Sequence, residues 1–323
     1  DRDEDFLAAE REEAELLVLI SPNLSTPILT ESKSLTTHGS GVIWQGKANT
    51  LSSEHCVEWP VIDAVKQATR RFERSPIKED FSHFPLEETL FNTPIRQGNL
   101  TAETAILGRR SAVAMDGSTS ISKATFFHML ARLIPTQDRR AIPWDAIPWR
   151  PRIHIGLFVH RVDGLMPGIY TLVRDLDKID ILKKVMHSEF CWHKVPDCPP
   201  GLPLYLLKEG DYRELATKVS CGQDIAGDGA FSLAMIADYR STVATYGSEF
   251  YRNLFWEAGM IGQVLYLEAE ESGIRATGIG CYFDNPVHTA FGIVSSEWQS
   301  FYHFTVGGPV EDNRLMTLPA YNF

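Results

Sequence analysis

Helical periodicity is clearest in residues 120–133, where apolar side chains recur three and four positions apart and form one face: Phe126, Phe127, Leu130 and Leu133. Ser120 or Ser122 stands before this face and can cap the first turn, because a serine oxygen accepts a hydrogen bond from the backbone there. We therefore expect a helix that begins after one of these serines and ends near Leu133.

The next segments are predicted as strands. Residues 153–175 read IHIGLFVHRVDGLMPGIYTLVRD, with apolar runs on both sides of Asp163–Gly164 and Pro167–Gly168. Such turn residues between apolar runs indicate a hairpin-like pair of strands. Residues 212–239 predict a helix that breaks at Gly227–Gly229 and continues as a buried strand, FSLAMIA.

The C-terminal part of the sequence predicts four more elements. The first two are a helix over 250–273 that ends at Gly273 and a strand over 274–283. A short helix over 284–293 follows, with Asn285 as its cap and Pro286 in its first turn, and then a strand over 300–309 before an extended tail. Because helices and strands are intermixed with hairpins, the pattern predicts an α+β fold.

The long helix over 250–273 holds the most unusual residues of this pattern. Its apolar positions cover more than one face, so we expect the first half to be buried nearly all round. Glu257 lies inside this run and needs a partner, which we predict to be an arginine in a structural ion pair. Gly259 and Gly262 each cost a helix about 1 kcal/mol. We therefore expect another backbone to approach them closely, in the core or at a subunit interface.

Residues 1–100 have a different texture and look extended rather than self-contained. We expect an acidic helical run over residues 1–17, a short strand over 16–20, a Ser/Thr-rich loop through Gly41, and a helix over Val61–Phe72 with Pro60 near its start. The chain does not begin with methionine, so we expect it to be a processed or excised piece of a longer protein.

Composition narrows the function classes. The net charge of −11 and the absence of a run of about 20 apolar residues argue against nucleic acid and against a membrane span. The five cysteines are odd in number and irregularly spaced, so we expect reduced thiols and a cytoplasmic location. Cys191 and Cys198 flank His193, but this spacing does not predict a zinc site, and we expect no metal.

Two groups of residues are candidates for binding. Arg109, Arg110, Ser111 and Arg314 could together hold a phosphate, although each alone is typical of an ordinary surface. The segment Gly278–Ile279–Gly280 could let a planar ligand approach the backbone, or could simply pack tightly. The segment PWDAIPWRPR, residues 143–152, is either a packed loop or a ligand wall, and His154 and His160 are expected to be ordinary hydrogen-bonded histidines.

Taken in order, four segments resemble the nitroreductase superfamily of FMN-dependent oxidoreductases, and its SagB-type dehydrogenase branch most of all: RRSAVAMDG with ISKATFFHML, HIGLFVHRVDGLMPGIYTL, the run from FYRNLFWEAGMIG to GIGCYFDNPV, and FYHFTVGGP with its basic tail. The resemblance covers roughly residues 105–318. Residues 42–69 are similar to the tail of one such unit, which implies that the chain is the second unit of a tandem protein.

The resemblance implies a nitroreductase-like fold with a mainly antiparallel sheet around the long helix, in a domain over 101–323 preceded by a linker over 1–100. It implies FMN as cofactor, with the phosphate held by Arg109, Arg110, Ser111 and Arg314, and the ring beside the backbone of Gly278, Ile279 and Gly280. NAD(P)H as electron donor, a small-molecule or peptide substrate, and a homodimer or pairing with a tandem unit are implied as well.

Three positions depart from the family pattern. Val113 stands where the family often has a basic residue, residues 142–152 replace a polar Ser/Asn-rich segment, and the Lys-Tyr pair of azoline-oxidising relatives does not occur. The last departure argues against azoline oxidation. The first two favour an alternative function, in which the fold is a flavin-free scaffold or binding subunit of a biosynthetic complex.

Overall fold

The computed structural model describes residues 10–11, 50–52, 59–70, 77, 79–91, 100–137, 142–312, 314, 316 and 318. Contacts divide the chain into two compact units, residues 1–67 and 68–323. The functional boundary predicted at residue 100 stays a prediction.

In the first unit, β1 (Glu10–Arg11) pairs antiparallel with β2 (Thr50–Ser52). The acidic helix predicted over residues 1–17 is therefore wrong at Glu10–Arg11, and the strand predicted over 16–20 lies outside the described residues. Helix α2 (Pro60–Ala68) begins at the predicted proline and ends before Phe72.

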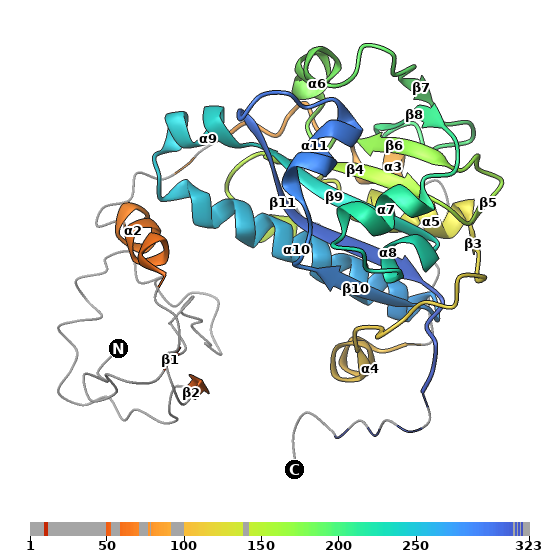
Figure 1. The fold of residues 1–323 in the computed structure, drawn as a ribbon. Helices are drawn as coiled ribbons and strands as arrows, with labels where there is room; N and C mark the ends of the chain where they lie inside the picture. The colour runs from red at the N-terminus through yellow and green to blue at the C-terminus, as the bar shows by residue number, and fades with distance from the viewer. Residues whose placement is uncertain are drawn as a thin grey trace, which may run out of the picture. The chain divides into compact units, whose positions relative to one another are not determined.

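The second unit is built on a seven-stranded sheet with the order β10-β11-β9-β4-β6-β8-β7, in which each neighbouring pair is antiparallel (Figure 1). The strands are β4 (Ile153–Val159), β6 (Gly168–Leu172), β7 (His193–Lys194), β8 (Leu204–Glu209), β9 (Phe231–Asp238), β10 (Arg275–Ile279) and β11 (Trp298–Gly307). A separate parallel pair joins β3 (Ile121–Ser122) to β5 (Val162–Asp163). The predicted hairpin of β4 and β6 is confirmed.

Helices cover both faces of this sheet, which makes three layers. The first core cluster holds residues of α3 (Glu87–Leu90), α5 (Lys123–Ala131) and α10 (Phe250–Glu271). The second holds residues of α6 (Ile179–Val185), α7 (Arg213–Val219), α8 (Ile225–Asp228) and α11 (Asp284–Phe291). Leu157 of β4 points into the first cluster and Phe158 into the second, as successive residues of a strand must. The α+β prediction is confirmed.

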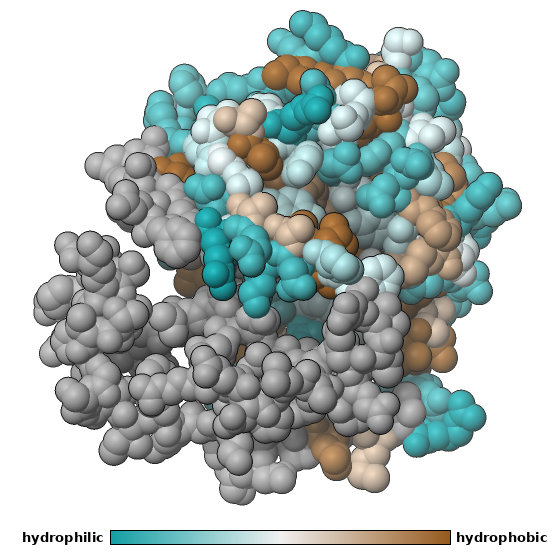
Figure 2. Space-filling model, turned by 60° about the vertical axis from the view of Figure 1, so that its left-hand side comes forward, coloured by the Kyte–Doolittle hydropathy of each residue, from teal (hydrophilic) through white to brown (hydrophobic). Residues whose placement is uncertain are grey.

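The remaining helices connect these layers: α4 (Ala102–Gly108), α9 (Tyr239–Tyr246) and the 3-10 turns η1 (Trp144–Ala146) and η2 (Leu176–Lys178). On the face shown in Figure 2, the described hydrophobic residues form small patches separated by hydrophilic ones.

Helix ends follow the predicted capping chemistry with one exception. The Ser122 side chain accepts a hydrogen bond from the Thr125 backbone N–H and caps α5. Gly273 follows α10 with a left-handed φ of +70°, which favours glycine. The predicted cap at Asn285 is wrong, because α11 already begins at Asp284 after an extended Phe283.

Glu257 is buried in the middle of α10, and its predicted ion pair is confirmed. Arg174 Nη1 donates to Glu257 Oε1, and both side chains are 1% exposed. The backbone N–H groups of Arg152 and Ile153 each donate to the same carboxylate at 3.1 Å, and Trp149 Nε1 donates at 3.3 Å. Residues 142–152 therefore form a packed loop that completes the hydrogen bonds of a buried charge.

One stripe of α10 is exposed, so the prediction of burial nearly all round is wrong. The stripe consists of Arg252, Phe255, Gly259 and Gln263. A Cβ on Gly259 would meet nothing within 4 Å, whereas one on Gly262 would lie 3.2 Å from the Phe304 ring. The predicted close approach of another backbone is therefore found at neither glycine. Gly262 has a close neighbour, but it is the Phe304 side chain.

Candidate functional site

The arginine-serine segment lies beside the edge strand of the sheet. Helix α4 ends at Gly108, and the chain then runs parallel to β10, where Ser111 forms a bridge with Ala276. The Ala112 N–H donates to the Ala276 carbonyl at 3.1 Å, and Thr277 Oγ1 donates to the Ala112 carbonyl at 2.7 Å. Two motifs that are far apart in the sequence therefore meet at the outer edge of β10.

Tyr266 of α10 links these two motifs directly. Its hydroxyl lies 2.7 Å from Ser111 Oγ and accepts a hydrogen bond from the Gly278 N–H at 2.9 Å. The Arg109 guanidinium lies over the Tyr266 ring, 4.5 Å from its centroid. Nothing in the sequence marks Tyr266 apart from its place on the long helix, so sequence reasoning missed it.

The three residues of the glycine segment have different environments. A Cβ on Gly278 would lie 1.8 Å from the Tyr302 hydroxyl, so the absent side chain makes room for tyrosine. Ile279 is 2% exposed and packs in the second core cluster. Gly280 is exposed, and a Cβ there would meet nothing within 4 Å. Tight packing therefore accounts for Gly278, and an open backbone remains at Gly280.

The other two predicted arginines bind parts of this chain. The Arg110 guanidinium donates to the carbonyls of Leu107 at 3.0 Å and Arg109 at 2.7 Å. Arg314 is 89% exposed and pairs with Asp312, with Nη2 2.7 Å from Oδ2. The tail itself returns to the segment after Ser111, since the Val310 N–H donates to the Ala114 carbonyl at 3.0 Å.

The Arg109 side chain differs from these two, because its guanidinium has no hydrogen-bond or ion-pair partner among the described residues and contacts only the Tyr266 ring there. A half-buried guanidinium with free donors, next to the exposed Ser111 hydroxyl, is suited to a phosphate group. The exposed Gly280 backbone is suited to a flat ring that approaches the strand edge. The residues present therefore fit the phosphate and ring of a flavin mononucleotide, with Val113, 80% exposed, contributing no charge.

The cysteine prediction requires a correction at this edge of the sheet. Cys221 and Cys281 form a disulfide, so the expectation of five reduced thiols is wrong, although Cys191 and Cys198 are free. Spacing could not reveal the pair, because the two residues are 60 apart in the sequence and meet where the end of α7 is hydrogen-bonded to the segment after β10.

A buried polar cluster lies beside the disulfide. His303 Nδ1 lies 3.4 Å from Ser220 Oγ, and its Nε2 lies 3.3 Å from Ser300 Oγ. The His303 ring stacks on Tyr282 at a centroid distance of 4.3 Å. Burial lowers the pKa of His303 to about 3, so the imidazole is neutral at physiological pH.

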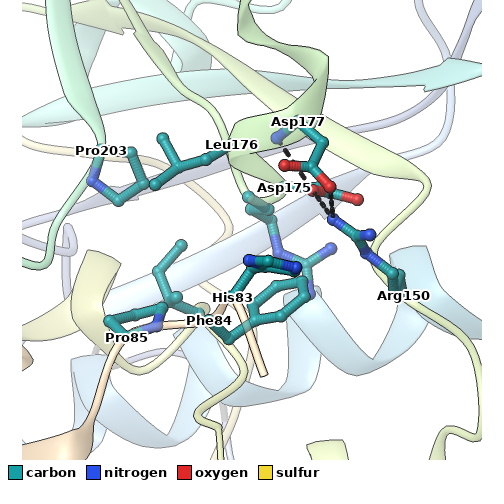
Figure 3. Close-up of a pocket in the computed structure, with 10 residues that line it drawn as sticks. His83, Phe84, Pro85, Arg150, Asp175, Leu176, Asp177 and Pro203 are labelled. Carbon is teal, nitrogen blue, oxygen red and sulfur yellow. Dashed lines mark hydrogen bonds and ion pairs between the residues drawn. The ribbon is translucent and has the colours of Figure 1, made fainter. Parts of the chain in front are cut away.

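Two cavities elsewhere have different chemistry. The one in Figure 3 has a volume of about 10 Å³, about enough for one water molecule, and the Arg150 ion pairs with Asp175 and Asp177 line it. The second, about 410 Å³, is lined by charges of both signs, including Arg161, Arg213 and Asp228. Neither cavity is lined by a predicted site residue.

The described residues contain neither a metal-binding cluster nor a membrane-spanning helix. No group of three or more His, Cys, Asp or Glu side chains there could hold a metal ion. Among the helices of the described segments, none combines the length and the apolar character that crossing a membrane requires.

No protein-family model matches the sequence, and neither does any curated protein. Solved structures do match. A candidate nitroreductase from Anabaena variabilis is 21% identical, with a TM-score of 0.57 over 81% of this chain and 48% of that one. This chain thus spans about half the length of that protein.

Two further matches have lower scores. The E. coli microcin synthetase McbBCD complex with truncated pro-MccB17 bound is 15% identical, with a TM-score of 0.45 over 76% of this chain and 87% of that one. The NADPH:FMN oxidoreductase of Vibrio harveyi, complexed with NAD+, is 13% identical, with a TM-score of 0.36 over 67% and 78%. At these identities the likeness concerns the fold alone, and the Anabaena structure carries it: the chain has the nitroreductase fold.

Proposed function

We propose that this chain is an FMN-dependent oxidoreductase of the nitroreductase type, with NAD(P)H as electron donor and a small-molecule or peptide substrate. The observation that supports this most is the meeting of Arg109, Ser111 and Gly278 around the Tyr266 hydroxyl. A nitroreductase fold supplies the frame, and these residues supply an anion-binding edge beside an open glycine backbone.

In this proposal Arg109 and Ser111 hold the FMN phosphate, and the backbone at Gly280 lies beside the ring. The bound flavin would supply hydride transfer, while the protein binds and orients it. Tyr266 is a positioning residue, because its hydroxyl holds Ser111 and the Gly278 N–H in one place. The proposal gives the other three residues no contact with the cofactor, because Arg110 donates to backbone carbonyls, Ile279 packs in the core and Arg314 pairs with Asp312.

The test is the binding of FMN to the purified chain, followed by its visible spectrum after desalting and by quenching of its fluorescence on titration. Arg109→Ala should raise the dissociation constant for FMN about tenfold to a hundredfold, as expected for the loss of one charge-assisted phosphate contact. Arg213→Ala is the control, because it removes one arginine from an exposed position away from this edge, where Arg213 pairs with Asp211. Equal FMN affinity in wild type and Arg109→Ala would contradict the assignment of the phosphate site.

A second candidate function is a flavin-free scaffold or binding subunit of a biosynthetic complex. It is favoured by the engagement of both the Ser111 hydroxyl and the Gly278 N–H with Tyr266, and by the exposed Val113. A colourless protein that retains no added FMN would favour this function over the oxidoreductase.

We also propose a homodimer in which the exposed stripe of α10 packs against its own copy, or a pairing with a preceding tandem unit through the same stripe. Phe255 is 45% exposed on this stripe, and Gly259 leaves space for a second helix to approach. A two-fold axis through Gly259 would bring the same surface of each subunit together.

A further inference from the structure

The Cys221–Cys281 disulfide joins two segments that the sheet does not hold together. Cys221 lies in the loop after α7, which ends at Val219, and Cys281 follows the exit of β10 at Gly280. The bridge therefore ties the exposed end of the glycine segment to a neighbouring loop.

The bridge is within reach of solvent. Cys281 is exposed and Cys221 is half-buried. Cys221 also has a left-handed φ of +56°, followed by Gly222 at +69°, and a residue with a side chain seldom adopts this conformation. The oxidised bridge thus holds an unfavourable backbone conformation at one of its two ends.

Hydrogen bonds and one ring contact also hold residues 281–283. The Phe283 N–H donates to the Val219 carbonyl at 2.8 Å, and Gln223 Nε2 donates to the Cys281 carbonyl at 3.1 Å. Tyr282 stacks on the buried His303 and donates to the Ser300 carbonyl at 3.0 Å. A Cβ on Gly280 would meet no other atom within 4 Å. The disulfide adds a covalent link to the two hydrogen bonds that join this segment to the end of α7 and the loop after it.

We propose that the Cys221–Cys281 disulfide is a reducible clamp: a dithiol reductant opens it, and opening releases residues 280–283 at the exit of β10. A thiolate of the reductant attacks Sγ of Cys281, the more exposed of the two cysteine residues. The bond between the two sulfurs breaks, and Cys221 leaves as a thiolate that takes up a proton.

The second thiol of the reductant then displaces Cys281, which also takes up a proton. Two electrons and two protons have passed to the protein, and the reductant has become a disulfide. The consequence for FMN binding rests on the proposed function, since Gly280 is part of that site. The opening of the clamp does not depend on the proposed function.

The experiment uses the full chain with Cys56, Cys191 and Cys198 replaced by serine, so that only the pair remains. Dithiothreitol is added in native buffer, and thiols are counted with a maleimide. Hydrogen exchange of the peptide around residues 278–284 is compared before and after reduction. We expect a change from zero to two thiols without unfolding, and exchange at Cys281–Phe283 at least about tenfold faster.

The double variant Cys221→Ser/Cys281→Ser should show the fast exchange without any reductant, and the peptide of α5, in the same samples, should exchange at its original rate. A bridge that stays oxidised until the protein unfolds would overturn the proposal. So would a pair that air does not oxidise, or an unchanged exchange rate after reduction.

FMN titration of the oxidised and reduced forms separates the two proposals. A dissociation constant at least about tenfold higher in the reduced form would show that the clamp governs the glycine segment. Equal FMN affinities of the oxidised and reduced forms would show that opening the disulfide does not affect FMN binding, and would overturn the link between the clamp and the proposed site. Absence of FMN binding in both forms would refute the proposed function, while thiol counting and hydrogen exchange would still decide the clamp.

Discussion

At the scale of single residues, Glu257 shows how one buried charge organises its surroundings. The carboxylate accepts hydrogen bonds from Arg174, from two backbone N–H groups and from Trp149. Burial lowers the pKa of Arg174, and the Glu257 charge opposes that shift. The pair is therefore stable only while both partners are present.

Glu257→Gln should lower the free energy of unfolding by about 3 kcal/mol, because it leaves the Arg174 charge buried without a counter-charge. Urea denaturation monitored by circular dichroism measures this. Glu271→Gln, at the exposed end of the same helix, is the control and should change stability by less than about 0.5 kcal/mol. A loss as small as that for Glu257→Gln would refute the role of the ion pair.

The buried His154 is expected to make the free energy of unfolding depend on pH. Both its ring nitrogens are buried without a hydrogen-bond partner in the described structure, contrary to the prediction from sequence, and burial lowers its pKa to about 3. Between pH 6.5 and 3 the unfolded chain binds a proton at this residue that the folded chain does not. Its contribution to stability is therefore complete above pH 6.5 and falls by about 1.4 kcal/mol for each pH unit below it.

His154→Leu should reduce the slope of unfolding free energy against pH by about 1.4 kcal/mol per unit between pH 6 and 4. His303 and His160, whose pKa values burial lowers to about 3 and about 4, keep the remaining slope. Urea titrations at several pH values provide the measurement. A slope equal to that of the wild type in His154→Leu would contradict the assignment.

Some residue roles followed from the sequence and others could not. Ser122 as a cap and Glu257 as half of an ion pair were predictable, because capping is local and a charge in an apolar run requires a partner. Tyr266 and the Cys221–Cys281 pair were not, because their partners lie on other elements that only the tertiary fold brings near. The sequence likewise could not show that Arg314 pairs with Asp312, or that the Arg109 guanidinium has no ion-pair partner among the described residues.

At the scale of elements, α10 combines a buried face with one exposed stripe. Periodicity predicted the helix and its end at Gly273, but it did not show the stripe, because Phe255 and Gly259 are themselves apolar or small. Hydrophobic pattern alone does not distinguish a core neighbour from a second subunit.

Gly259→Arg should weaken the proposed homodimer by about a hundredfold, because it places two like charges at a two-fold axis. The folded monomer should remain, since a side chain at this position meets nothing within 4 Å and arginine favours a helix. Sedimentation equilibrium measures the association. Val294→Arg, at a position 97% exposed, is the control, and an unchanged dimer in Gly259→Arg would argue for an interface elsewhere.

At the scale of the whole molecule, the class of the fold was predictable and its strand order was not. The local patterns indicated β4, β6, β9 and β11 separately. Only long-range pairing places β11 between β10 and β9, and β4 next to both β9 and β6. The resemblance in four ordered segments indicated the fold, which periodicity could not, because a family resemblance carries information about how distant segments meet.

The backbone pairing of Ser111 with Ala276 also sets an order of events during protein synthesis. Arg109 and Ser111 leave the ribosome before β10, β11 and Val310, whose backbone N–H donates to the Ala114 carbonyl. Until they emerge, the early segment has no strand to lie against, and its polar backbone is solvated by water. The contact between these segments therefore forms only after translation has passed residue 310, and under the proposed function FMN is bound after that point.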